Sequence, residues 1–286
     1  MTDAFVPMRA LDTLWFQVAG TVCNIACTHC FISCSPTNHA HEMLSLDAIE
    51  PYLEEARRLG VRDYYFTGGE PFMNREMVPI LRRTLEQGAA SVLTNGMLFH
   101  RELCRTLREL FDASEYSLDL RVSLDGFNAE THDAIRGAGV WDRVMTGLRN
   151  LGEVGLNPVI TVTAAASGIE TSEGRARFLE IIRGFGFTKP RLKVLPLFRI
   201  GAEETRTHGY DERERITPEM LEQGDVGVLQ CSSSRMVTSK GVFVCPILIE
   251  EREARMGTTI GETLRSFPLK YHACHTCWVD GVTCAT

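Results

Sequence analysis

Short apolar runs alternate with longer mixed runs over the first two thirds of the chain. Runs of this kind that are bounded by turn residues predict buried strands, and the longer runs between them predict helices. The predicted strands are Leu14–Val18, Arg62–Thr67, Ala90–Thr94, Leu118–Leu124, Pro158–Thr163 and Arg191–Leu195. The predicted helices are Ser45–Leu59, Asn74–Gln87, about His100–Leu110, Trp141–Val154 and Glu173–Phe185.

Cap residues support two of these helices. Ser45 is an N-cap candidate for the first helix, and Gly60 follows its end. Asn74 and Gly88 bracket the second helix in the same way. Six strand–helix units in series predict an α/β fold with a parallel sheet and right-handed crossovers, with the chemistry in loops at the carboxyl ends of the strands.

The last third of the chain has a different pattern. The segment Met236–Val244 predicts a short hairpin with its turn at Ser239-Lys240-Gly241. Before it, the charged stretch Arg199–Arg215 predicts a solvated linker, with a loop that covers the substrate as the alternative.

Composition limits the classes of function. A chain of 286 residues with 44% apolar residues can bury one large α/β core and a small additional module. Neither an apolar run long enough to span a membrane nor a signal-peptide layout is present in the sequence, so we expect a cytoplasmic protein. The formal net charge of −7 and the lack of a basic block argue against a nucleic-acid partner. Ten cysteines without an export signal favour metal binding over disulfides.

Three of these cysteines form a CxxxCxxC run after the first predicted strand, at Cys23, Cys27 and Cys30. Closely spaced thiolates suit an iron–sulfur cluster. A [4Fe–4S] cluster held by three cysteines keeps one iron open for a ligand, much as a catalytic zinc keeps a free position. Zinc sites usually combine CxxC pairs with a second pair or histidines, and core cysteines have no reason to recur at these intervals. The run therefore favours an iron–sulfur cluster.

Several further segments make the chain resemble the radical S-adenosylmethionine (SAM) superfamily. Members have CxxxCxxC after the first barrel strand and Gly-Gly-Glu-Pro at the end of the second, which here is Gly68-Gly69-Glu70-Pro71. The segments Val92–Gly96 and Arg121–Gly126 are similar to later family strands, and Ser123–Leu151 is similar to members with extra C-terminal clusters. The resemblance covers nearly the whole chain and implies a partial (β/α)6 TIM barrel that binds a [4Fe–4S] cluster and SAM.

The resemblance also implies residue roles. The three cysteines hold the cluster, and the amino and carboxylate groups of SAM chelate its fourth iron. Gly68 and Gly69 let the backbone approach the SAM amine because they lack Cβ. Glu70 is expected beside that ammonium group, and Pro71 stiffens the turn.

Four more positions are implied for SAM with less specific signals. Ser123 matches a hydroxyl that contacts the ribose or the carboxylate, and Arg136 matches an arginine that pairs with the carboxylate. Either position is alternatively an ordinary surface residue. Phe31 and Leu195 are candidates to flank the adenine, with core packing as the alternative.

A second cysteine group lies near the C-terminus and includes the CxxC pair Cys274–Cys277. It resembles the auxiliary-cluster module of the SPASM/Twitch subfamily in its short, one-cluster form, with a spacing similar to that of the dehydrogenase of butirosin biosynthesis. The resemblance implies a core domain of residues 1–215 and an auxiliary domain of residues 216–286. The preferred ligands of one auxiliary [4Fe–4S] cluster are Cys231, Cys245, Cys274 and Cys277, with Cys284 as a substitute ligand, a hydrogen-atom donor or a free thiol. A zinc site is the alternative.

The family chemistry implies an electron from flavodoxin or ferredoxin, reductive cleavage of SAM and abstraction of a substrate hydrogen atom by a 5′-deoxyadenosyl radical. Only thirteen residues precede the first predicted strand, which favours a small hydroxylated substrate, such as an aminocyclitol or sugar, over a peptide. We expect dehydrogenation with the auxiliary cluster as electron acceptor. The alternatives are a peptide maturase, an epimerase with Cys34, Cys104 or Cys284 as hydrogen donor, and a non-enzymatic electron carrier, which the intact Gly-Gly-Glu-Pro segment argues against.

Overall fold

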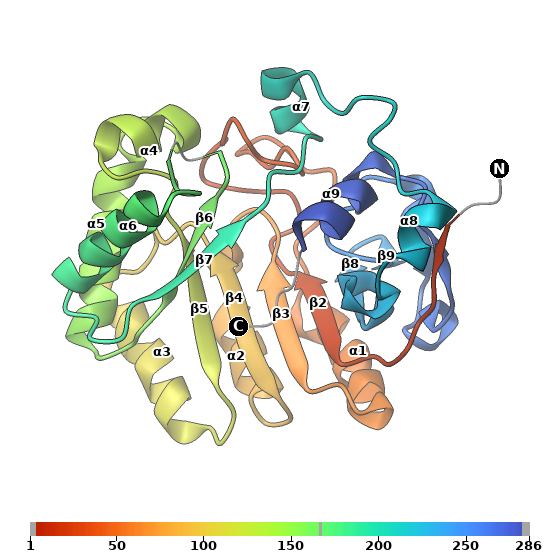
Figure 1. Cartoon of the computed structure of the whole chain (residues 1–286). Helices are drawn as coiled ribbons and strands as arrows, with labels where there is room; N and C mark the ends of the chain where they lie inside the picture. Colours follow the sequence, from red (N-terminus) through yellow and green to blue (C-terminus); the bar gives the residue numbers. More distant parts are fainter. Residues whose placement is uncertain (1–3, 166–167, 282–286) are drawn as a thin grey trace.

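Six parallel strands, β2 to β7, form the centre of the fold (Figure 1). The structure is a computed structural model that describes residues 4–165 and 168–281. In these residues one sheet has the strand order β10-β9-β8-β2-β3-β4-β5-β6-β7. Its strands are β2 (Thr13–Gln17), β3 (Asp63–Thr67), β4 (Ala89–Thr94), β5 (Leu118–Ser123), β6 (Val159–Thr163), β7 (Arg191–Leu195), β8 (Ser234–Thr238), β9 (Gly241–Phe243) and β10 (Arg255–Gly257).

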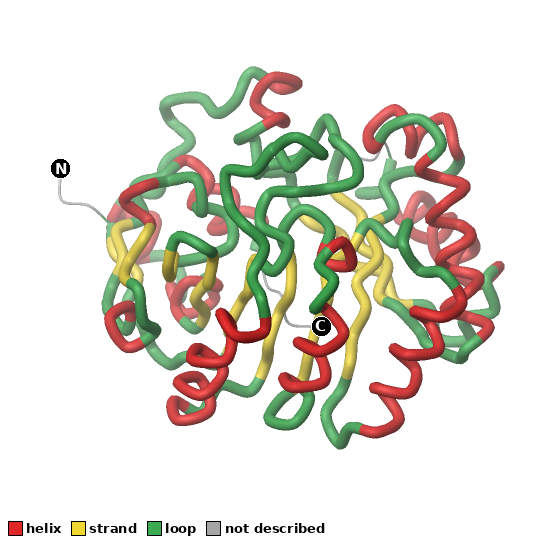
Figure 2. Tube along the Cα trace, turned by 180° about the vertical axis from the view of Figure 1, so that it is seen from behind, coloured by secondary structure: helices red, strands yellow, loops and turns green. Residues whose placement is uncertain are grey.

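Helices cover the outer side of this curved sheet. Figure 1 shows α1, α2 and α3 behind the strands, and Figure 2, seen from behind, shows helices in front of them. The helices are α1 (Leu46–Leu59), α2 (Met77–Thr84), α3 (Arg101–Ala113), α4 (Ala129–Arg136), α5 (Val140–Glu153), α6 (Ser172–Gly184), α7 (Ala202–Thr207), α8 (Pro218–Glu222) and α9 (His272–Asp280). The predicted partial (β/α)6 barrel is therefore confirmed, and each predicted strand has its counterpart.

Alternation along each strand separates the two faces of the sheet. On β2, Phe16 is fully buried and its ring stacks on that of Phe66 of β3, with 5.7 Å between centroids. On the opposite face, Trp15 stacks on Tyr65 at 4.5 Å. Trp15 also lines a cavity described below, so its face of the sheet is the barrel interior, where a ligand can bind.

The first predicted helix ends as its caps indicate, but the second does not. The hydroxyl of Ser45 accepts a hydrogen bond from the Ala48 N–H at 3.2 Å, and Gly60 closes α1 with a left-handed φ of +80°. The prediction that Asn74 opens the second helix is wrong, because α2 begins at Met77. The Asn74 amide group instead donates to the carbonyl oxygens of Val18 and Leu44, at 2.8 Å each, and so ties down the loop after β2.

The C-terminal segment continues the barrel sheet. The predicted hairpin is present as β8 and β9, and β8 pairs in parallel with β2. A separate pair joins β1 (Phe5–Val6) to β11 (Phe267–Pro268). The boundary between residues 215 and 216 remains a prediction.

The stretch of residues 199–215, predicted as a solvated linker, is largely exposed but is not without structure. Helix α7 lies in this stretch, and Glu203 within it is fully buried. The charges pair with each other: Arg206 Nη2 lies 2.6 Å from Glu203 Oε1, and Arg199 pairs with Glu214. The backbone N–H of Ala202 donates to the carbonyl of Cys30 at 3.0 Å, so the stretch packs on the cysteine loop.

No helix within residues 4–165 and 168–281 is both long and apolar enough to cross a membrane.

Candidate functional site

The CxxxCxxC loop and the carboxyl ends of the barrel strands enclose one cavity, which we call the N-terminal cysteine cavity. Its volume is about 190 Å³. Cys23, Cys27 and Cys30 line it together, as the sequence predicts for a shared ligand set. The other predicted site residues in its wall are Phe31, Gly68, Gly69, Ser123, Arg136 and Leu195.

The three thiols differ in acidity. Burial raises the pKa of Cys23 to about 11 and that of Cys27 to about 12. The pKa of Cys30 is lowered, chiefly by a hydrogen bond from the Cys34 thiol, and the Cys34 backbone N–H also donates to Cys30 Sγ at 3.2 Å. Metal binding requires thiolates, so iron must displace protons from Cys23 and Cys27.

The two glycines of Gly68-Gly69 accommodate the protein's own cysteine loop. A Cβ on Gly69 would lie 1.9 Å from the Val22 carbonyl oxygen and 2.8 Å from the Cys23 nitrogen. Gly68 has a φ of +135°, which favours glycine. The Gly69 N–H donates to the Gly20 carbonyl at 2.9 Å. The missing Cβ atoms therefore allow the loop that carries Cys23 to pack against the end of β3.

Glu70 and Pro71 lie behind the cavity and are not among its lining residues. The fully buried Glu70 carboxylate accepts hydrogen bonds from the Thr94 hydroxyl at 2.7 Å and from the backbone N–H groups of Asn95 at 2.8 Å and Phe72 at 3.1 Å. The Asn95 side chain in turn donates to Cys23 Sγ at 3.8 Å. Glu70 thus fixes the end of β4 that contacts the cysteine loop.

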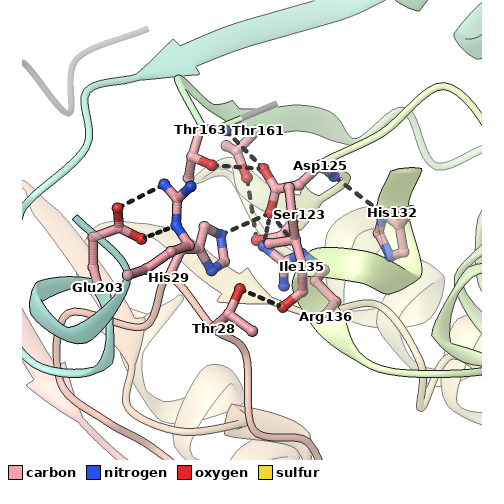
Figure 3. Close-up of polar contacts among 11 residues, drawn as sticks. Thr28, His29, Ser123, Asp125, His132, Ile135, Arg136, Thr161, Thr163 and Glu203 are labelled. Atoms are coloured by element: carbon pink, nitrogen blue, oxygen red, sulfur yellow. Dashed lines mark hydrogen bonds and ion pairs between the residues drawn. The ribbon is translucent and has the colours of Figure 1, made fainter. Parts of the chain in front are cut away.

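Asp125 is the centre of a buried polar cluster beside the cysteines (Figure 3). Its Oδ2 accepts from Arg136 Nε at 2.7 Å and lies 2.9 Å from His29 Nε2, while its Oδ1 accepts from the Thr163 N–H at 2.8 Å. Burial alone would raise the pKa of Asp125, but Arg136 and His29 outweigh it and hold the pKa well below its usual range. Arg136, predicted to pair with SAM, is therefore already paired with a carboxylate, although it still lines the cavity.

The remaining predicted SAM residues lie in the same wall. The Ser123 hydroxyl is 3.4 Å from that of Thr161 on the neighbouring strand. The rings of Phe31 and Phe198 are 5.7 Å apart, and Leu195 ends β7 beside them. All three predicted positions, Phe31, Ser123 and Leu195, thus contact the space in which a ligand would bind.

The second cysteine group lines another space, which we call the C-terminal cysteine cavity. Cys231, Cys245, Cys274 and Cys277 all contribute to its wall, from segments up to 46 residues apart. Burial raises the pKa of Cys274 to about 12 and also raises the pKa values of Cys231 and Cys245. Cys284, the fifth predicted candidate, lies outside the described residues. Throughout residues 4–165 and 168–281, His, Cys, Asp and Glu side chains form no group close enough to surround a single metal ion.

A buried cation adjoins this second group. Arg235 of β8 is fully buried and donates to the backbone carbonyls of Cys231 at 2.8 Å and Thr263 at 3.0 Å. Burial lowers its pKa to about 10, while the neighbouring thiolates of Cys231 and Cys245 act in the opposite direction. A buried positive charge near the thiols of Cys231 and Cys245 suits a site that becomes anionic when a metal centre binds.

A third space, the middle cavity, shares wall residues with both cysteine cavities. Its volume is about 110 Å³. It shares two wall residues, Gln230 and Ile247, with the C-terminal cysteine cavity. The residues that it shares with the N-terminal cysteine cavity are His29, Phe31, Ile32, Thr67, Leu93, Thr161, Thr163 and Leu195.

Sequence reasoning missed several residues of these walls. Arg121 and Trp15 line the middle cavity, but both lie inside runs that were recognised only as strands. Asn95, in the wall of the N-terminal cysteine cavity, follows β4 directly, and Asp125, behind that wall, lies two residues after the end of β5. Their place after parallel strands is the signal that could have identified them, because such loops carry the chemistry in barrel folds.

Comparisons with known proteins agree with this geometry. Residues 18–188, which are 171 of the 286 residues, match the family model described as "Radical SAM superfamily". A probable GTP 3′,8-cyclase from Methanosarcina acetivorans is 32% identical over 185 residues, which are 62% of this chain and 52% of the cyclase. The chain thus spans about half the length of this curated relative.

Two solved structures are similar in fold. SuiB of Streptococcus suis bound to the precursor peptide SuiA has a TM-score of 0.64 and 14% identity over 87% of this chain and 62% of SuiB. BtrN in complex with AdoMet and 2-DOIA has a TM-score of 0.50 and 12% identity over 96% of this chain and 89% of BtrN. At these identities the likeness supports the fold and not a shared substrate.

Proposed function

The chain belongs to the radical SAM superfamily, and from this premise we propose that it dehydrogenates a small hydroxylated substrate with a second iron–sulfur cluster as electron acceptor. The family uses a [4Fe–4S] cluster and SAM. When bound, these groups supply a 5′-deoxyadenosyl radical for hydrogen abstraction and, in a SPASM/Twitch-type module, an acceptor for the electron that the substrate loses. The substrate thereby loses two hydrogen atoms and becomes a ketone or aldehyde.

The observation that supports this proposal is the arrangement of the three cavities. The middle cavity shares wall residues with both cysteine groups. A substrate held there is adjacent to the group that starts the reaction and to the group that accepts the electron. An epimerase does not require this arrangement, because its substrate radical regains a hydrogen atom. A peptide maturase that crosslinks or oxidises its substrate also has to dispose of an electron, so a small substrate is preferred because the middle cavity holds only about 110 Å³.

The chain's own residues fit the two clusters. Cys23, Cys27 and Cys30 would hold the SAM-binding cluster, with the Asn95 amide as a hydrogen-bond donor to Cys23. Cys231, Cys245, Cys274 and Cys277 would hold the auxiliary cluster, and the buried charge of Arg235 would balance its negative charge. The walls of the middle cavity exclude water from the substrate.

Iron content tests this assignment. After anaerobic reconstitution we expect about eight irons per wild-type chain and about four in a Cys23→Ala/Cys27→Ala/Cys30→Ala variant. We also expect about four in a variant that replaces Cys231, Cys245, Cys274 and Cys277 by alanine. Cys104→Ala, a buried cysteine of α3 outside all three cavities, is the matched control and should retain the wild-type content.

Product analysis tests the reaction. With SAM and dithionite, a substrate deuterated beside its hydroxyl group should transfer deuterium to 5′-deoxyadenosine and lose two hydrogen atoms in total. Four irons in the wild-type chain would mean that no auxiliary cluster is present, and dehydrogenation would be rejected. A product of unchanged mass that has exchanged one hydrogen would instead identify an epimerase.

A further inference from the structure

Apolar side chains form most of the wall of the middle cavity. Ten of the sixteen residues that line it in the described chain are apolar, and they include the aromatic residues Trp15, Phe31 and Phe198. Leu197 and Pro246 are also among them, so both the segment after β7 and the C-terminal segment contribute apolar surface. The volume of about 110 Å³ approaches that of an engineered apolar cavity of about 150 Å³ that binds benzene, so one small ring or branched chain fits.

Three polar residues of this wall, His29, Arg121 and Thr163, are already bound by other side chains. Nε2 of His29 lies 2.9 Å from Asp125 Oδ2, and the Thr163 hydroxyl donates to Asp125 Oδ1 at 3.0 Å. Nη2 of Arg121 donates to the Tyr65 hydroxyl at 3.1 Å, and its guanidinium carbon lies 5.0 Å from the centroid of the Tyr65 ring. The folded chain thus binds these groups before a ligand enters.

The composition of the wall disfavours amines and sugars. Among the described residues that line the middle cavity, none is Asp or Glu. An ammonium group would be buried here without a carboxylate, and each sugar hydroxyl that lost water without gaining a partner would weaken binding. An aminocyclitol and a sugar, the examples suggested by the sequence, are therefore poor ligands for this cavity.

Thr161 brings one hydroxyl group to the boundary between two cavities. It belongs to β6, lines both the middle cavity and the N-terminal cysteine cavity, and has 5% of its surface exposed. Its hydroxyl lies 3.4 Å from that of Ser123, and a hydroxyl group has one donor and two acceptor positions. The pair can therefore bind one further hydroxyl group.

We propose that the substrate of the dehydrogenation is a compact alcohol with an apolar skeleton, aliphatic or aromatic, whose single hydroxyl group binds Thr161. This inference rests on the proposed function. Burial of the skeleton in the middle cavity removes apolar surface from water, which stabilises the complex without polar partners. The hydroxyl group that is oxidised then lies on the side of the middle cavity that adjoins the N-terminal cysteine cavity.

Calorimetric titration of the reconstituted holoenzyme with saturating SAM tests the inference. The probes are 3-methylcyclohexanol, benzyl alcohol, and cyclohexane-1,3-diol, in which a second hydroxyl group replaces the methyl group of the first probe. The two monoalcohols should bind saturably with a negative heat-capacity change, and the diol should bind at least tenfold more weakly than 3-methylcyclohexanol. Tighter binding of 3-methylcyclohexanol indicates an aliphatic skeleton and tighter binding of benzyl alcohol an aromatic one, and both support the inference.

Variants of the wall locate the binding site. Leu197→Asn places an amide in the apolar wall and should weaken binding of both monoalcohols at least tenfold. Leu197→Thr replaces this variant if Leu197→Asn does not fold. Leu59→Asn, at an exposed position at the end of α1, is the matched control and should bind as the wild type does. Thr161→Val removes the hydroxyl group at nearly constant volume and should weaken binding about fivefold.

Three results would overturn the inference. They are equal binding of the diol and 3-methylcyclohexanol, no saturable binding of either monoalcohol, and unchanged binding in the variants of Leu197 or Thr161. The iron counts and the deuterium transfer above do not use these probes. A failure of the dehydrogenation and a failure of this inference are therefore distinguishable.

Discussion

Replacing Gly69 by alanine should loosen the contact between the end of β3 and the cysteine loop. The new Cβ would lie 1.9 Å from the Val22 carbonyl oxygen, where ordinary contact begins at 3.4 Å, so the backbone must move apart by about 1.5 Å. That movement breaks the bonds from the Gly69 N–H to Gly20 at 2.9 Å and from the Glu70 N–H to Val22 at 3.1 Å. The loss of two buried hydrogen bonds costs about 2–4 kcal/mol.

Alanine also restricts the unfolded chain, which offsets about 0.5–1 kcal/mol of this loss. The expected decrease in the free energy of unfolding is therefore about 1–3.5 kcal/mol. Anaerobic urea denaturation measures it, and the variant should also retain less iron, because the displaced segment includes Cys23. Gly184→Ala is the matched control, since Gly184 ends α6 with nothing within 4 Å of an added Cβ. Equal stabilities of the two variants, together with full iron content in Gly69→Ala, would refute the reasoning.

Three more predictions concern the buried polar groups. Glu70→Gln should lower the free energy of unfolding by about 1–3 kcal/mol in urea denaturation, because the new amide NH₂ would face an N–H or O–H group that now donates to the carboxylate. Unchanged stability would contradict the assigned hydrogen bonds. Asp125→Asn should cost about 3–5 kcal/mol, since it leaves the buried Arg136 without its carboxylate, whereas Asp112→Asn in an exposed pair should leave the urea midpoint unchanged. Burial lowers the pKa of His132 in the folded chain from 6.5 to about 4. As the pH drops from 6.5 to 4, this histidine is therefore protonated in the unfolded chain before it is protonated in the folded chain, and the free energy of unfolding falls by about 3 kcal/mol. His132→Gln should lose less stability than the wild type over that interval, and an identical pH profile would exclude this histidine as a source of the effect.

The barrel could be predicted because most residues of β2 to β6 are buried, while β7 at the edge of the sheet is half-buried. Such strands appear in the sequence as short apolar runs, and each predicted run has a counterpart among β2 to β7. The start of α2 could not be predicted in the same way. Asn74 has the chemistry of an N-cap, but its amide binds the carbonyls of Val18 and Leu44, which only the folded chain places nearby.

The site was predictable where its signal is local and unpredictable where it depends on the fold. The run Cys23–Cys30 identifies one cavity wall because its three thiols lie within one loop. Glu70 was expected to face SAM, but its role depends on Thr94 and Asn95, which reach it from the end of another strand. Arg121 was hidden because a charged residue in an apolar strand is informative only when the barrel interior is known.

The segment after β7 explains how one cavity comes to adjoin two distant cysteine groups. Leu195 and Phe198 line the middle cavity, and the backbone of Ala202 then binds the carbonyl of Cys30. Further on, the Tyr210 hydroxyl lies 2.7 Å from that of Thr276, which stands between Cys274 and Cys277 in α9.

This stretch reads as solvated in the sequence because its charges are numerous, yet they pair within it, as Arg199 does with Glu214 and Arg206 with Glu203. These pairs stay partly exposed, while the backbone of Ala202 and the hydroxyl of Tyr210 attach the stretch to the two cysteine groups. A single ordered connection therefore contacts both of them and the cavity between them. The separation of the two groups is consequently fixed by the fold, as electron transfer from a substrate held between two clusters would require.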